Sequence, residues 1–139
     1  MYEINFKLPE GWTSRSETFE DESGNELSHL EAGTEGYELD VYAGVLPEDE
    51  TAEDQAFSNY ADMVGFDEDD PEDFNPVSKI KFNGKNAWTF DALCEDDRPM
   101  RLISQEVRQG VLVITCFNAP DEDSLDEMHA LIERSLRIR

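Results

Sequence analysis

Few side chains in this sequence are suited to chemistry beyond simple charge. There are two histidines, His29 and His129, and two cysteines, Cys94 and Cys116. Nucleophilic catalysis needs an oriented histidine beside a nucleophile. Ser28 precedes His29, but neighbours on a strand point to opposite faces, and no Gly-x-Ser-x-Gly elbow is present. We therefore expect no catalytic residue and no enzyme, while a cysteine–histidine pair formed only in space stays open.

The same residues lack the spacing of a metal or cofactor site. The cysteines do not form a C-x-x-C motif, and the histidines are too far apart in the chain for a zinc motif. Asp67 and Asp69 match the first and third ligands of an EF-hand loop. Glu72 then falls at the sixth position, where the loop requires glycine, and Pro71 at the fifth. Glycine patterns that bind phosphate are also missing. The sequence therefore predicts no metal and no cofactor.

The densest charge lies in an acidic segment bracketed by two aromatic residues. Six carboxylates between two phenylalanines would suit a basic partner, with apolar contact at the rim. The alternative is that the phenylalanines anchor the loop ends in the core while the acids stay solvated. The candidate partner-binding residues are Phe66, Asp67, Glu68, Asp69, Asp70, Glu72, Asp73 and Phe74.

The charge of the whole chain excludes several partners. The net charge is −23, and residues 1–75 carry −21 of it while residues 76–139 carry −2. This field repels nucleic acid and anionic lipid and attracts basic proteins and cations. Acidity of this kind also occurs as an adaptation to high salt or as an aid to solubility.

No apolar run of 18 residues is present, so we expect no membrane insertion. We expect a cytoplasmic protein, and a leader removed before Met1 is compatible with the sequence.

The spacing of apolar residues along the sequence predicts the strands and helices that would position these side chains. Residues 37–46 alternate clearly, and the Asn83-Gly84 dipeptide is a strong hairpin signal. Residues 111–117 are apolar on both faces, which predicts a central strand in which an aspartate at Ile114 would be buried. Two Glu-rich segments, 15–20 and 26–31, are weaker strands that we expect to be exposed. Further strands are predicted at 2–8, 77–82, 85–94 and 100–107, and helices at 51–65 and 121–136.

This order of elements predicts one α+β domain spanning residues 1–139. We expect an antiparallel β-sheet of about six to seven strands, with two main helices packed on it. Thr51 and Gly65 are the expected caps of the first helix. Trp12 and Trp88 are expected in the core rather than in a binding cleft, as is Phe90.

Several motifs together resemble the PsbP-like superfamily, which includes bacterial DcrB-like proteins. The segment from Phe6 through Leu8-Pro9 to Gly11-Trp12 is similar to the N-terminal strand and turn of that superfamily. The hairpin at 83–90, the strand at 110–115 and the closing helix continue the likeness. The resemblance implies a PsbP-like sandwich that acts as a non-catalytic binding or adaptor domain. Some DcrB-like proteins are chaperones of secreted effectors.

Three classes of function follow. The first is a non-catalytic protein-binding or adaptor domain, such as a chaperone or an immunity-like partner of another protein. Its partner would be basic or would carry an exposed apolar segment, and a homodimer stays open. The second is an acidic nucleic-acid mimic that binds a basic protein. The third is an enzyme with an unrecognised site, which needs a pocket with convergent polar groups.

Overall fold

The computed structural model describes residues 2–20, 22–63 and 76–139, and within them the chain is an α+β protein. A seven-stranded antiparallel sheet, a two-stranded sheet and two helices are present, which confirms the predicted class. In chain order the elements are β1 (Ile4–Phe6), β2 (Thr13–Glu20), β3 (Glu26–Thr34), β4 (Tyr37–Val45), α1 (Ala52–Met63), β5 (Ser78–Phe82), β6 (Lys85–Leu93), β7 (Pro99–Arg108), β8 (Val111–Asn118), α2 (Glu122–Ser135) and β9 (Leu136–Ile138).

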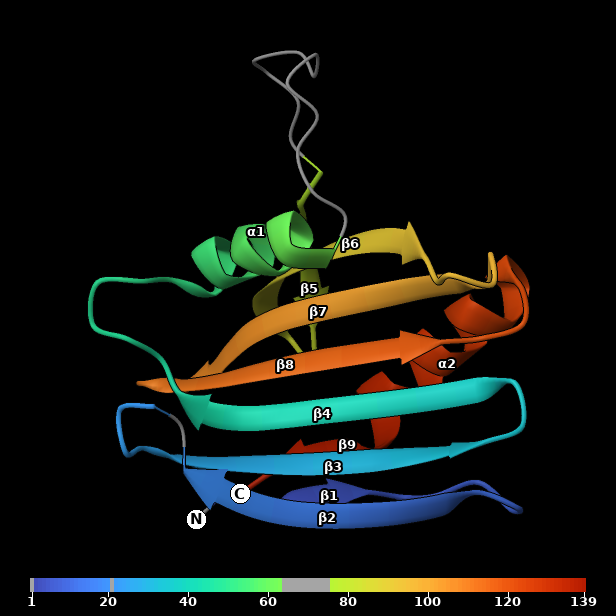
Figure 1. Cartoon of the computed structure of the whole chain (residues 1–139), viewed down its shortest axis with the longest axis horizontal. Coiled ribbons are helices and arrows are strands. Elements are labelled where there is room, and N and C mark those ends of the chain that lie inside the picture. Colours follow the sequence, from blue (N-terminus) through green and yellow to red (C-terminus); the bar gives the residue numbers. More distant parts are fainter. Residues whose placement is uncertain (1, 21, 64–75) are drawn as a thin grey trace.

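The large sheet is built from two meanders that meet side by side. Its strand order is β2-β3-β4-β8-β7-β6-β5, so β8 is the central strand, as its apolar sequence predicts. Figure 1 shows the β2–β4 meander on one side of β8 and the later hairpins on the other. Asn83 and Gly84 adopt φ angles of 54° and 81° between β5 and β6, the left-handed conformations that a type I′ hairpin turn requires.

The two ends of the chain pair with each other. β1 runs antiparallel to β9, with Ile4 opposite Ile138 and Phe6 opposite Leu136. The sequence predicts the first strand but not β9, because three residues after a helix carry too short a pattern to read. This small sheet lies behind the large one in Figure 1, beside α2. Its apolar side chains extend the main core.

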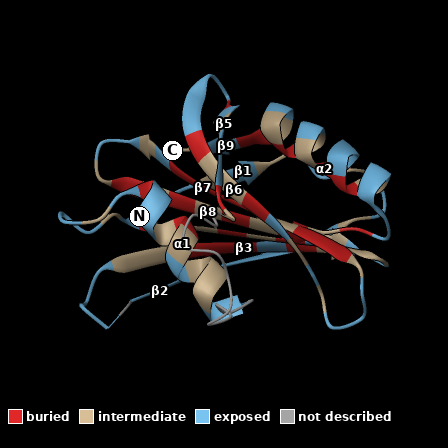
Figure 2. Ribbon diagram, turned by 90° about the horizontal axis from the view of Figure 1, so that it is seen from above, coloured by how far each residue is buried: buried red, intermediate tan, exposed pale blue. Residues whose placement is uncertain are grey.

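One face of the large sheet, which we call the closed face, is covered by α2 and the β1–β9 pair. Asp121 caps α2 by accepting a hydrogen bond from the Ser124 backbone N–H at 2.8 Å. Figure 2 shows the buried side of α2 turned toward the sheet and its exposed side toward solvent. The main core lies here and includes Leu39, Val41, Ile103, Val113, Phe117, Leu125, Met128 and Ile132.

The opposite face carries α1, which packs mainly on β6 and β7. The helix begins with a reciprocal cap: Thr51 N–H donates to Asp54 Oδ2 at 3.0 Å, and Asp54 N–H donates to Thr51 Oγ1 at 3.1 Å. This confirms the predicted start, while the predicted cap Gly65 lies outside the described residues. The smaller core under α1 is made of Ala56, Val77, Phe90 and Leu102.

Two expectations about burial are wrong. The segment 26–31 was expected to be exposed, but it belongs to β3, which lies between β2 and β4 and buries Ser28, His29 and Leu30. Ile114 was expected in the core, but it points to the α1 side and is only half-buried. Burial depends on what surrounds a strand: β3 is flanked by two strands, whereas α1 contacts mainly β6 and β7 and leaves Ile114 partly uncovered. β2 is exposed throughout, as expected for its sequence.

The three aromatic residues expected in the core differ in how far they are buried. Phe90 is buried, whereas Trp12 and Trp88 are half-buried and pack against the two core clusters. Trp12 stands between Phe6 and Tyr37, with ring centroids 6.2 and 5.9 Å away. These contacts connect the start of the chain to β4 and give the Trp12 ring a structural role.

Candidate functional site

The part of the α1-side face formed by β2, β3 and β4 is covered by neither described helix. Cross-strand register aligns its side chains in rows, because residues directly opposite in antiparallel strands point to the same face. One row runs from Glu17 through His29 and Tyr42 to Ile114. We call this surface the open face, and its residues are Arg15, Glu17, Leu27, His29, Glu31, Asp40, Tyr42, Ile114 and Cys116.

His29 is the centre of the polar part of the open face. Its side chain is 10% exposed, Nε2 lies 2.8 Å from Asp40 Oδ1, and Nδ1 lies 3.4 Å from Glu17 Oε1. The ring stacks on Tyr42 with centroids 4.2 Å apart and planes 3° from parallel. The histidine is therefore held by contacts on both ring nitrogens and on one ring face.

Carboxylates dominate the electrostatics around His29. Glu31 lies opposite Asp40 in the register and accepts a hydrogen bond from Arg15 at 3.0 Å. The Arg15 and Glu31 side chains are 71% and 53% exposed, so this ion pair adds little to stability. Burial, followed by the charge of Asp40, raises the pKa of the Tyr42 hydroxyl. Tyr42 therefore stays a neutral hydrogen-bonding and stacking group at physiological pH.

An apolar hollow of about 290 Å³ adjoins this polar cluster. It lies between the end of α1 and the open face, and Asp40 lies on its polar side. Burial, with a smaller contribution from Asp40, raises the pKa of the Cys116 thiol in its wall to about 12. The thiol is thus protonated at neutral pH and is a poor nucleophile. The lining residues are Leu27, Asp40, Tyr42, Asn59, Met63, Leu102, Ile114 and Cys116.

The second histidine belongs to a different cluster on the closed face. Arg101 donates to both carboxylate oxygens of Asp91 at 2.7 and 2.9 Å and to Asp126 at 3.1 Å. Its third partner is Nδ1 of His129 at 3.1 Å. Burial, followed by the positive charge of Arg101, lowers the pKa of His129. This network ties β6 and β7 to α2, which is a structural role.

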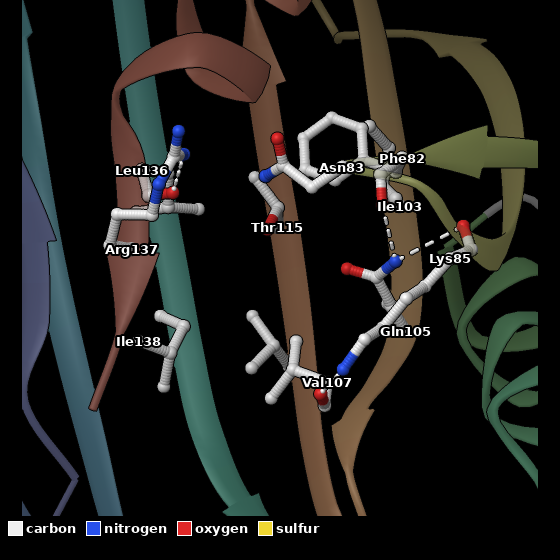
Figure 3. Close-up of a pocket in the computed structure, with 11 residues that line it drawn as sticks. Phe82, Asn83, Lys85, Ile103, Gln105, Val107, Thr115, Leu136, Arg137 and Ile138 are labelled. Atoms are coloured by element: carbon white, nitrogen blue, oxygen red, sulfur yellow. Dashed lines mark hydrogen bonds between the residues drawn. The ribbon is translucent and has the colours of Figure 1, made fainter.

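A smaller hollow of about 150 Å³ lies on the closed face, beside β9 and the β5–β6 turn. Figure 3 shows its one buried amide, Gln105, reaching toward the turn. The Gln105 amide N–H donates to the carbonyls of Phe82 at 2.8 Å and Lys85 at 3.4 Å. The amide nitrogen thus anchors the hairpin. Because sites for small molecules usually exceed about 300 Å³, this hollow is too small for a metabolite of ordinary size.

The clusters described above do not include the acidic segment that the sequence predicts as a binding site. The acidic segment from Phe66 to Phe74, including Asp67, Glu68, Asp69, Asp70, Glu72 and Asp73, lies outside the described residues. Both cysteines are free and half-buried. Within the described part of the chain no hydrogen bond joins a cysteine to a histidine; His29 faces Glu17 and Asp40, and His129 contacts Arg101.

Sequence reasoning missed the grouping of His29 with Glu31 and Asp40. A signal was present: the two strands are joined by only Glu35 and Gly36, with Thr34 opposite Tyr37. A two-residue turn sets the register of a hairpin. Counting back from it places His29 beside Tyr42 and Glu31 beside Asp40.

Comparison with protein-family models finds no match, and comparisons with curated proteins and with solved structures find no significant match. The likeness to PsbP-like and DcrB-like proteins therefore stays a prediction based on sequence motifs. Within the described residues no helix is long and apolar enough to cross a membrane.

Proposed function

We propose that this protein is a non-catalytic protein-binding or adaptor domain that binds its partner on the open face. The observation that carries the proposal is the apolar hollow beside Asp40, at the border between the end of α1 and the part of the sheet that neither described helix covers. Apolar side chains at its mouth are accessible: Met63 is 47% exposed, and Leu27 and Ile114 are half-buried. An accessible apolar hollow bordered by charge is typical of a surface that takes an anchoring side chain of a partner.

The chemistry of the surface favours a basic segment with an apolar side chain. Asp40 and Glu31 lie on the open face next to the hollow, and Glu38 follows one row further along β4. The wider charge of −21 in residues 1–75 would also steer a basic partner toward this half of the molecule. An extended segment that places a leucine-like side chain in the hollow and lysines or arginines over these carboxylates fits both features.

The other two classes of function have weaker support. A nucleic-acid mimic needs an array of free carboxylates, whereas Glu17 and Asp40 contact His29 and Glu31 pairs with Arg15. An enzyme needs polar groups that converge on a cavity. The hollow of the open face is mainly apolar, and the thiol in its wall is protonated.

A defined peptide tests the proposal. We expect an unstructured peptide of alternating leucine and lysine to bind the protein, as measured by fluorescence anisotropy in buffer with a chelator. Ile114→Ser should weaken binding about tenfold, because it removes an apolar wall of the hollow. Asp40→Asn should reduce the dependence of affinity on salt. Leu93→Ser, at an apolar side chain that is 65% exposed on β6, is the matched control and should bind like the parent.

The same assay separates this surface from the acidic segment. Replacing Asp67, Glu68, Asp69, Asp70, Glu72 and Asp73 by Asn or Gln should leave the association rate and its salt dependence nearly unchanged if the open face binds the partner. If that variant slows binding and flattens the salt dependence while Ile114→Ser does neither, the acidic segment is the binding site. That result would overturn the proposal.

A further inference from the structure

The open face also contains a set of metal-ligating groups, which includes the Glu31 and Asp40 carboxylates of the surface proposed for the partner. His29, Glu31 and Asp40 each offer one ligand atom, and these atoms all lie within 4.8 Å of one another. They come from two adjacent strands, with Glu31 directly opposite Asp40. The sheet itself therefore sets their spacing, without help from a loop.

The histidine is held as a metal ligand usually is. Its ring is packed against Tyr42 and its side chain is 10% exposed, so its direction is fixed. Nδ1 faces Glu17, which leaves Nε2 directed at Asp40. A ligating histidine commonly donates its other ring N–H to a carboxylate, which fixes the tautomer and aims the ligating nitrogen. Glu17 has the position of that orienting carboxylate.

The site is accessible, and its donors suit a particular class of ion. The Asp40 and Glu31 side chains are 37% and 53% exposed, so an ion can enter from solvent. One imidazole nitrogen with two carboxylate oxygens is a donor set that zinc accepts, with water at the fourth position. Calcium and magnesium prefer oxygen ligands throughout. The donor set therefore favours a transition-metal ion over either of them.

The distances require only small movements. Nε2 of His29 and Oδ1 of Asp40 are 2.8 Å apart, while donors around a tetrahedral zinc ion are roughly 3.4 Å apart, given bonds of about 2.1 Å. Arg15 must release Glu31, and this ion pair between exposed groups is weak. The ion would lie between Nε2 of His29 and the carboxylate of Asp40, with Nδ1 of His29 directed at Glu17.

We propose that His29, Glu31 and Asp40 bind a divalent transition-metal ion such as zinc, and that Glu17 positions the histidine. The preference for zinc over manganese follows from the general order of affinities at sites with nitrogen and oxygen donors. Glu31 and Asp40 also border the surface proposed for the partner, but the two tests are separate, because the peptide assay contains a chelator and the zinc titration contains no peptide. Zinc binding can fail while the peptide assay succeeds, and the reverse also holds.

Titration of the purified protein with zinc alone tests the proposal by calorimetry. We expect one ion per chain in the parent. His29→Gln and Asp40→Asn should each lower the affinity by at least about a hundredfold, and Glu17→Gln by about tenfold, since orienting partners typically contribute 10–100-fold. His129→Gln is the matched control on the closed face. Cys116→Ser is the control for thiolate binding on the open face. Both controls should bind like the parent.

Two further measurements distinguish ligation by His29 from general attraction of cations to the acidic surface. The imidazole signals of His29 in an NMR spectrum should shift with one equivalent of zinc while those of His129 do not, which detects ligation without any substitution. Magnesium should produce no such shift. The proposal is wrong if the parent binds no zinc. It is also wrong if His29→Gln binds zinc like the parent, because binding would then reflect only the attraction of cations to the acidic surface.

Discussion

The two faces of the large sheet use the same strands for different purposes. On the closed face, α2 and the β1–β9 pair cover a continuous apolar core that includes Ile103, Val113 and Phe117. On the other face, α1 covers β6 and β7, and the side chains of β2, β3 and β4 are mostly charged or aromatic, with Leu27 beside the hollow. The closed face therefore supplies most of the buried apolar area and so most of the stability. The open face can carry charge and a hollow because the fold relies on it less.

The two histidines show the same division at the level of single residues. His129 lies on α2 against Phe82 and Phe117, with the positive Arg101 beside it. His29 lies between two carboxylates on the open face. One environment opposes a positive charge on the ring and the other attracts cations. Identical side chains thus acquire a structural role on one face and a candidate binding role on the other.

The largest difference in stability between the two faces is expected for substitutions at two neighbouring residues of the central strand, β8. Val113 points to the closed face and Ile114 to the α1 side. We expect Val113→Asp to lose about 4 kcal/mol of unfolding free energy, because it buries an unpaired charge. Ile114→Asp, which is half-buried beside the hollow, should lose about 1–2 kcal/mol. Urea unfolding followed by circular dichroism measures both.

If Val113→Asp does not fold, alanine substitutions at the same two positions provide the test. Val113→Ala should then cost more than Ile114→Ala, since only the first leaves a void in a closed core. Equal losses in both pairs would show that the two faces contribute alike to stability, which contradicts the comparison.

A smaller difference is expected between two arginines, one on each face. Arg101 is 15% exposed and contacts Asp91, Asp126 and His129. Arg15 is 71% exposed and contacts Glu31. Arg101→Gln should cost about 2 kcal/mol, because charge-assisted hydrogen bonds in a shielded network are lost. Arg15→Gln should cost less than about 1 kcal/mol. Thermal melting at low and high salt gives both values, and a larger loss for Arg15 would reverse the assignment of the faces.

The smallest effect concerns the dependence of stability on pH through His129. Burial and Arg101 lower its pKa in the folded protein, so below a pH of about 6.5 the unfolded chain binds the proton more readily than the folded chain. His129 should therefore reduce stability as the pH falls through this range. The difference in unfolding free energy between the parent and His129→Gln should shift against the parent between about pH 8 and pH 5.5.

The parent and His129→Gln share all their other residues, so contributions from the rest of the protein cancel to first order. A difference that stays constant with pH, or that moves in favour of the parent at low pH, would show that the ring of His129 is not shielded on the closed face. The measurement requires only chemical unfolding at several pH values.

Local sequence signals were sufficient for most of the fold. The Asn83-Gly84 turn, the cap at Thr51 and the apolar run of β8 each act within a few residues, and each is where it was predicted. The pattern also indicated the α+β class and the antiparallel sheet. Boundaries and burial were less accurate where the pattern was weak, as for β3. A glutamate-rich strand looks exposed in the sequence, yet strands on both sides shield its central residues.

The sequence by itself determined the acidic charge, the turns and the two amphipathic helices, because charge and periodicity are properties of the chain. Tertiary structure decided which helix covers which face, since that depends on how the two meanders join at β4 and β8. It also decided that His29 and Glu31 meet Asp40 from the next strand. Residues far apart in the pattern become neighbours only when strands pair in one register, and pairing is a property of the sheet rather than of either strand.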